Sequence, residues 1–228
     1  AYTWSKAMTN TDSQLGAGIV NVYDLDAEYS VASFNVPHFL KLTWVYDLPF
    51  GEGRRFMNHG GLLNALLGGW TVTGVHNYRS GAPLSVDSEI NTDTTMFGGA
   101  IRPDVVPGVD VVVDEGGLDF ENGTRYLNPE AFEMPPVTSG GVPLRLGTGP
   151  RFLADVRGPA RVSEDFGLQK RFALTAGVSI DVRLDAFNVF NRAGRGNPIT
   201  DFTSPDFGLI KEPAYGPRSL QLMARVNF

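Results

Sequence analysis

Hydrophobic and polar residues alternate with a period of two along several long segments of the chain. The sharpest case is Gly177–Phe187. One side of this segment carries Val178, Ile180, Val182, Leu184 and Ala186, and the other carries Ser179, Asp181, Arg183 and Asp185. Strict alternation over about nine to eleven residues is typical of a β-strand with one apolar and one polar face. Six segments are therefore predicted strands: Tyr2–Thr9, His38–Leu48, Trp70–Arg79, Val162–Phe172, Gly177–Phe187 and Leu220–Phe228.

The connections between these strands differ greatly in length. Thr11–Val36, Asp87–Ala160 and Ala193–Pro217 are long, Pro49–Gly69 is intermediate and Arg171–Thr175 is a tight turn. The one helical signal is Leu62–Leu67, which glycines bracket and which predicts a single turn. Structureless loops longer than about 15 residues are uncommon in compact soluble domains, whereas outer-membrane barrels combine short periplasmic turns with long extracellular loops. With Phe228 on the periplasmic side, every long connection falls outside the cell, which favours a barrel.

Strand length and aromatic placement also favour a membrane barrel over a soluble β-sandwich. A tilted strand needs about 9–11 residues to cross a bilayer, whereas strands in globular proteins are most often about five or six residues long. Trp70 and Tyr78 share one face and lie eight positions apart in the sequence. At about 3.3 Å per residue they are separated by roughly 26 Å, which fits aromatic girdles at two interfaces. Trp44 and Tyr46 are further candidates for interfacial aromatic residues.

The polar face predicts an interior that excludes lipid. Asp181, Arg183 and Asp185 follow one another on this face, and a midplane Arg turned toward lipid costs about 2–4 kcal/mol. We expect these three residues to face a wet or plugged lumen and to pair with each other or with another domain. His76 breaks the pattern because it shares the apolar face with Trp70. It either lies near an interface or is turned inward by a bulge at Gly74.

Charge is concentrated in one connection. The chain has 228 residues and a formal net charge of −6. Between Asp87 and Glu133, eleven acidic and two basic side chains give −9, so the remainder carries +3. We interpret this segment as a mobile, solubilising extracellular loop. The alternative is a cation site, such as one for Ca²⁺, built from Asp110, Asp114, Glu115, Asp119 and Glu121, although the order of an EF-hand loop is absent.

Candidate catalytic chemistry is sparse. The chain has no cysteine and three histidines, His38, His59 and His76, which form no pair with metal-binding spacing. No phosphate-binding loop or nucleophile elbow is present, and the net acidity argues against nucleic-acid binding. We therefore expect no enzymatic activity, no cofactor and no metal. The alternatives are a soluble extracellular β-sandwich that acts in adhesion or carbohydrate binding, and a β-rich hydrolase for which no catalytic constellation is seen.

The last predicted strand has an apolar residue at every second position and ends in an aromatic residue. The set is Leu220, Leu222, Ala224, Val226 and Phe228. This pattern resembles the signal that the barrel-assembly machinery recognises. An unpaired amphipathic strand can add to an edge of the assembly protein through main-chain hydrogen bonds, while alternate side chains supply specificity. The plainer interpretation is that Phe228 belongs to the aromatic girdle, and both roles are compatible.

Several short motifs carry a resemblance to a known family, and they extend over roughly Phe34–Phe228. They are Asp47-Leu48-Pro49-Phe50-Gly51, Gly68-Gly69-Trp70, Arg79-Ser80-Gly81-Ala82-Pro83-Leu84, Arg102-Pro103, Leu127-Asn128-Pro129-Glu130-Ala131-Phe132, Arg157-Gly158-Pro159 and Asp185-Ala186-Phe187-Asn188-Val189-Phe190-Asn191. Together they resemble the C-terminal barrel portion of TonB-dependent outer-membrane receptors of the Oar-like type, which often carry an N-terminal carboxypeptidase-regulatory-like domain.

The resemblance implies an all-β fold, an antiparallel up-and-down transmembrane β-barrel of which residues 1–228 form a C-terminal section of about six strands. It implies energised uptake or surface binding of a ligand in the outer membrane of a Gram-negative type of cell. The implied partners are outer-membrane lipid, the barrel-assembly machinery, a plug domain, the remaining barrel strands, and the TonB complex through an N-terminal region outside this chain. Six strands are too few to close a membrane barrel, for which eight is the usual minimum.

Overall fold

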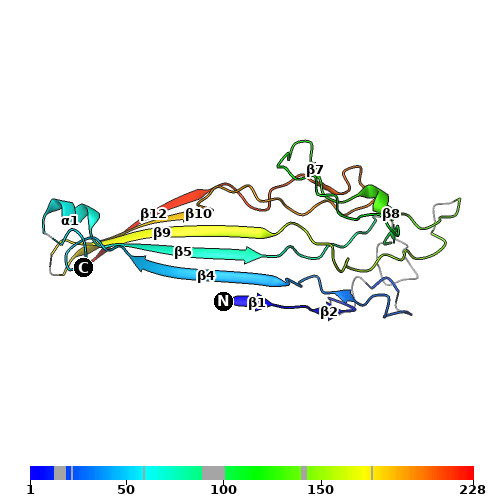
Figure 1. The fold of residues 1–228 in the computed structure, drawn as a ribbon, viewed down its shortest axis with the longest axis horizontal. Helices are drawn as coiled ribbons and strands as arrows, with labels where there is room; N and C mark the ends of the chain where they lie inside the picture. Colours follow the sequence, from blue (N-terminus) through cyan, green and yellow to red (C-terminus); the bar gives the residue numbers. More distant parts are fainter. Residues whose placement is uncertain (13–18, 22, 59, 89–100, 140–142, 176) are drawn as a thin grey trace.

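The long strands of the chain form one antiparallel sheet. The computed structural model describes residues 1–12, 19–21, 23–58, 60–88, 101–139, 143–175 and 177–228. The sheet has six strands in the order β1-β4-β5-β9-β10-β12, and successive long strands are neighbours (Figure 1). Their bounds are β1 Tyr2–Trp4, β4 His38–Asp47, β5 Trp70–Arg79, β9 Arg161–Ala173, β10 Ser179–Phe187 and β12 Ser219–Asn227. The strand predictions are thus confirmed except at the first segment.

That first segment is shorter than predicted. Only Tyr2–Trp4 pairs with β4, while β2 (Met8–Thr9) turns away to pair with β3 (Ser30–Val31). Between them, the Ser5 amide donates to the Pro37 carbonyl at 3.0 Å and Asn35 Nδ2 donates to the Ser5 carbonyl at 3.4 Å. Pro37 has no N–H to continue a ladder, so the chain leaves the main sheet at this point.

The pairing register produces two chemically different faces. Directly opposed residues lie on the same face of a sheet, so the row Tyr46, Val72, Leu168, Leu184 and Leu222 defines an apolar face across five strands. The row Asp47, Thr71, Gln169, Arg183 and Met223 defines the opposite, mainly polar face. The alternation seen in each strand therefore combines into two continuous surfaces.

The connections are sorted to opposite ends of the sheet. At one end are the turn after β9 and the segment between β4 and β5, which contains α1 (Leu62–Leu67), the single helical turn predicted from the sequence. The other end carries the long connections, which fold into a compact unit that we call the cap (Figure 1). The cap contains β2, β3, β6 (Asp104–Val105), β7 (Thr124–Arg125), η1 (Pro129–Ala131), β8 (Phe132–Glu133) and β11 (Leu209–Ile210).

The buried hydrophobic core of the molecule lies in the cap. It consists of Leu84, Val86, Tyr126, Leu127, Ala131, Phe132, Leu153, Phe207 and Ile210. The apolar face of the sheet, in contrast, is open, with Leu222 still 73% exposed. Among the described residues no second sheet is stacked on Ile180, Leu184 or Leu222, so a β-sandwich is not supported. None of the described helices is long and apolar enough to span a membrane.

Candidate functional site

The four aromatic residues expected at interfaces all lie on the apolar face, but at different heights. Trp70 lies at the short-turn end and Tyr78 near the cap, and Tyr46 opposes Val72, close to Trp70. Trp44 opposes Gly74, four residues from both Trp70 and Tyr78, so it lies midway between these two rings. The interfacial roles of all four residues stay predictions. Its indole covers Gly74 so closely that a Cβ there would lie 2.3 Å from the ring.

His76 is part of a polar network on the apolar face. The register runs through Gly74 without interruption, so the predicted bulge is absent and His76 points outward. Trp44 Nε1 donates to His76 Nε2 at 2.9 Å, which leaves the ring proton on Nδ1, 3.2 Å from the Tyr78 hydroxyl. That hydroxyl donates to Glu164 Oε1 at 3.2 Å, and Arg192 Nε donates to Glu164 Oε2 at 3.1 Å. The network therefore gives His76, Tyr78 and Glu164 polar partners on the apolar face.

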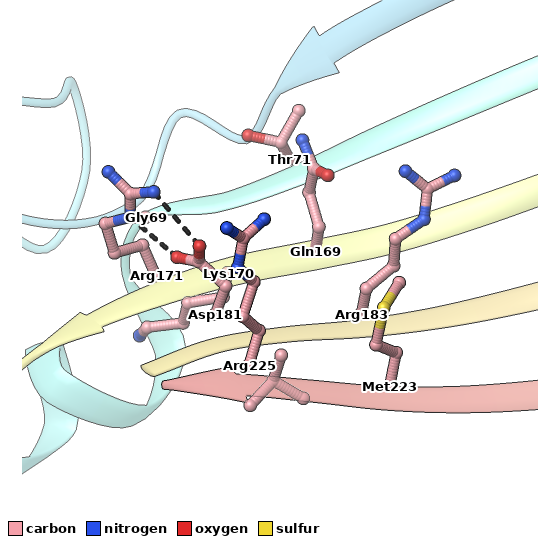
Figure 2. A pocket seen from close by; sticks show the side chains of 10 residues that line it. Gly69, Thr71, Gln169, Lys170, Arg171, Asp181, Arg183, Met223 and Arg225 are labelled. Carbon is pink, nitrogen blue, oxygen red and sulfur yellow. Dashed lines mark hydrogen bonds and ion pairs between the residues drawn. The ribbon is translucent and has the colours of Figure 1, made fainter. Parts of the chain in front are cut away.

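The polar face holds a cavity of about 490 Å³ beside the ends of β9, β10 and β12 (Figure 2). Arg171 and Asp181 face each other across β9 and β10 and form a two-pronged ion pair, with contacts of 2.6 and 3.0 Å. Arg183 Nε donates to Asp185 Oδ2 at 2.8 Å on the same strand. The structure therefore places Asp181, Arg183 and Asp185 on one face, each in an ion pair. Outer-membrane barrels direct their polar face to the interior.

Buried and half-buried ion pairs tie the cap together. Arg102 Nη2 donates to Glu28 Oε1 at 2.6 Å, and Arg151 Nη1 donates to Asp12 Oδ2 at 2.5 Å. Both pairs connect the first long connection to the second. Arg195 pairs with Asp114 and so connects the second to the third. All three long connections therefore form a single unit.

The acidic segment is largely part of this folded unit. The Arg145 guanidinium and the amide and hydroxyl of Thr148 lower the pKa of Asp104 to about 2, although burial alone would raise it. Arg195 likewise lowers the pKa of Asp114. The described part, 101–133, packs Tyr126, Leu127 and Phe132 into the cap core, so the interpretation as a mobile loop is wrong there. Glu89 and Asp93 lie outside the described residues.

The alternative of a cation site gains no support. No three acidic or histidine side chains converge in the part of the chain that the structure describes. Asp114 is already paired with Arg195, and Asp119 accepts hydrogen bonds from the amides of Glu121 and Asn122. These carboxylates shape turns and hold loops together.

A second cavity, of about 330 Å³, lies inside the cap next to the Arg102–Glu28 pair. Its walls come from the first and second long connections: Val20, Asn21, Asp24, Ala27, Glu28, Arg102, Leu146, Gly147, Thr148 and Gly149. This cavity could not be predicted from the sequence, because neither Glu28 nor Thr148 lies in a recognisable motif. It appears only when the two connections fold together.

The motif residues behind the family resemblance are structural. Asn188 and Asn191 both adopt φ of 50°, and the side chain of Asn188 donates to the Arg192 and Gly216 carbonyls. They form the turn after β10. Arg157 donates to the carbonyl and side-chain oxygens of Asn35 at 3.0 and 2.6 Å, where the chain leaves the cap for β4. Gly81 lies so close to Gly158 that any side chain would collide with its carbonyl.

Strand β12 lies at one outer edge of the sheet. Its register with β10 places Leu220, Leu222, Ala224 and Val226 on the apolar face, and Phe228 is fully exposed. The geometry is that of an amphipathic edge strand. Its recognition by the barrel-assembly machinery stays a prediction.

Comparison with known proteins agrees with this geometry. No curated protein and no solved structure matches the chain. A sequence model described as an outer membrane beta barrel domain matches residues 1–221, nearly the whole chain. The antiparallel sheet of long strands, its apolar outer face and its segregated connections are features of that class, although the described strands do not close into a barrel. The chain therefore belongs to the outer membrane β-barrel domain family, which implies a location in the outer membrane.

Proposed function

We propose that this chain is the C-terminal barrel section of a TonB-dependent, Oar-like outer-membrane transporter or receptor. Its role is energised uptake or surface binding of a ligand. The observation that carries this proposal is the cap at the end of the sheet (Figure 1). Its second and third long connections share one hydrophobic core, and two ion pairs, Arg102–Glu28 and Arg151–Asp12, tie the first connection to the second. A barrel that serves only as a membrane anchor needs no folded unit there. Since long loops of such barrels are extracellular, the cap faces outside and α1 faces the periplasm.

The open edges of the sheet support a larger barrel. Among the described residues β1 and β12 each have one neighbour, and lipid does not satisfy an unpaired strand edge. We propose that further strands pair with both edges and that a plug domain fills the interior. The cavity beside Arg171 and Asp181 offers partly exposed charged groups for such a plug to contact.

We propose no covalent chemistry. His38 Nδ1 lies 2.8 Å from the Tyr2 hydroxyl, and His76 is occupied by Trp44 and Tyr78. His59 lies outside the described residues. Arg102, Arg151 and Arg195 of the cap and Arg171 of the sheet are each engaged in an ion pair with a structural role.

Photo-crosslinking in the intact receptor tests the proposal. A photoreactive residue replaces Met223 on the polar face or, as the matched control, its neighbour Leu222 on the apolar face. We expect Met223 variants to crosslink to a plug domain of the same receptor and Leu222 variants to crosslink to lipid. The purified receptor should also bind the periplasmic domain of TonB. Absence of both the plug crosslink and TonB binding would leave a plain barrel and overturn the proposal.

A further inference from the structure

Helix α1 exposes its leucines in a way that the remainder of the described structure does not explain. Leu62, Leu63, Leu66 and Leu67 are 82%, 67%, 59% and 52% exposed. A helix advances about 100° per residue, so these four side chains occupy a sector of about 140°. They form one apolar surface, which we call the leucine face.

The orientation of this face is fixed by the opposite side of the helix. Asn64 points into the turn, where its Oδ1 accepts a hydrogen bond from the Glu52 amide at 2.9 Å. Gly68 lies against Gly51, with room for no side chain, since a Cβ on Gly68 would be 2.6 Å from the Gly51 Cα. With its polar residue and its glycine contact turned inward, the helix has its leucines turned outward.

Two side chains of the apolar face attach the helix to that face. Trp70 Nε1 donates to the Leu66 carbonyl at 2.9 Å, and Lys170 Nζ donates to the Ala65 carbonyl at 2.6 Å. The Lys170 ammonium also lies 5.6 Å from the Trp70 ring and 4.7 Å from the Phe172 ring. These bonds satisfy carbonyls that the short helix leaves free at its C-terminal end. The leucine face therefore continues the membrane-facing surface of the sheet.

We propose that the leucine face of α1 is an interfacial anchor that inserts into the inner, phospholipid leaflet of the outer membrane. The apolar residues of interfacial helices lie about 5–10 Å into the boundary between headgroups and acyl chains. The exposed guanidinium of Arg55, in the turn beside the helix, is complementary to lipid phosphates. Arg54 and Arg171 pair with Asp47 and Asp181 on the polar face and are not part of this surface.

The same turn extends the apolar surface. Phe50 and Phe56 lie in contact, with ring centroids 5.8 Å apart, and both remain partly exposed. Arg55 lies over the Phe56 ring at 5.3 Å, an arrangement common where an aromatic residue meets a charged interface. The inference depends on the family's membrane location and holds whether or not the barrel transports a ligand.

Fluorescence quenching by brominated phospholipids tests the anchor directly. The chain has no cysteine, so Leu63→Cys adds a single thiol to it for a bimane label. Glu52→Cys, exposed in the same turn but away from the leucine face, is the matched control. The complete receptor is reconstituted in phosphatidylethanolamine–phosphatidylglycerol vesicles with and without bromine on the acyl chains.

We expect brominated lipid to lower the fluorescence of the Leu63→Cys label at least twofold and that of the Glu52→Cys label by less than a fifth. Aqueous iodide should show the reverse order. Equal lipid quenching at both sites would overturn the proposal. A Leu63→Cys label shielded from lipid and iodide alike would also overturn it, because a protein surface would then cover the helix. Both positions are exposed, so the substitutions leave folding intact.

Discussion

The sheet and the cap use the same apolar residue types in opposite ways. In the cap, Leu127 and Ile210 are completely buried among other side chains. In the sheet, Leu220 and Leu222 lie on an outer surface and remain 64% and 73% exposed to whatever surrounds the protein. The cap is therefore stabilised by packing within the chain, as in a water-soluble domain. The sheet depends on lipid to cover its apolar face, and its own contacts are mainly the ladders between strands.

The polar residues show the same contrast. The ion pairs of the polar face connect residues on the same or adjacent strands, such as Arg171 and Asp181. The ion pairs of the cap connect distant segments, such as Arg151 and Asp12, which are 139 positions apart. A pair of this kind closes a long loop, so removing one partner should loosen a whole connection.

The largest expected effect is a cavity in the cap core. Leu127→Ala should lower the local free energy of unfolding of the cap by about 3–5 kcal/mol, since a fully buried leucine loses its contacts and leaves a void. Leu222→Ala, the matched change on the sheet, should cost less than about 1 kcal/mol because lipid fills the space. Hydrogen exchange of cap and sheet amides in the reconstituted protein measures the two losses. Similar losses at both positions would show that the two regions are stabilised alike.

The second prediction compares the two faces of the sheet by adding a charge to each. Leu222→Arg places a guanidinium in hydrocarbon and should destabilise the barrel by about 2–4 kcal/mol if this position lies near the midplane. Met223→Arg, one residue along on the polar face, should be tolerated within about 1 kcal/mol. Urea unfolding of the protein from vesicles gives both values. A greater loss at Met223 would mean that the faces have been assigned the wrong way round.

The strands of the sheet and their two faces could be predicted from the sequence because the alternation that reveals them lies within each strand. Alternation within one strand reveals both faces, and Leu62–Leu67 between glycines was enough to indicate α1. Because long and short connections alternate along the chain, the long ones were expected at the same end of the sheet. The position of Trp44 could not be obtained in this way, because its height depends on the register with β5, which no single strand encodes.

The cap was missed for a physical reason. Its strands are two residues long, too short to show any periodicity, and its pairs join residues such as Arg102 and Glu28, 74 positions apart. Its acidic composition suggested a solvated loop, although Asp104 and Asp114 are bound by arginines from elsewhere in the chain. The cavity beside Glu28 depends on the same non-local contacts.

The third prediction concerns acid sensitivity of the cap. Arg145, together with Thr148, lowers the pKa of Asp104 to about 2 in the folded protein, below its unfolded value. A lowered pKa adds stability above about pH 4, and this stability is lost as the pH falls toward 2. We expect the cap to lose about 1–2 kcal/mol over that range, with solvent screening of the half-exposed Arg145 taken into account. Limited proteolysis of the cap between pH 5 and 2 measures the loss, and Arg145→Met should remove most of the pH dependence.

The smallest effect is expected where two carboxylates meet in the cap. Asp87 and Asp201 form a bridge between the second and third long connections, where the Phe202 amide donates to the Asp87 carbonyl at 2.7 Å. Burial, and then the charge of Asp201, raise the pKa of Asp87, so its ionised form weakens the fold at neutral pH. Asp87→Asn keeps the shape, removes the charge and should stabilise the cap by less than about 1 kcal/mol at pH 7.

This gain should shrink as the pH is lowered through the pKa of Asp87, because the native carboxyl then becomes neutral as well. Asp201→Asn is the informative contrast. It relieves the same repulsion but weakens the hydrogen bonds that Asp201 Oδ1 accepts from the amide and hydroxyl of Thr203, at 2.9 and 2.6 Å. Its net effect should therefore be near zero or destabilising. A loss of cap stability in Asp87→Asn at pH 7 would contradict this prediction. It would mean that the ionised Asp87 carboxylate makes a favourable interaction that helps to join the second and third connections.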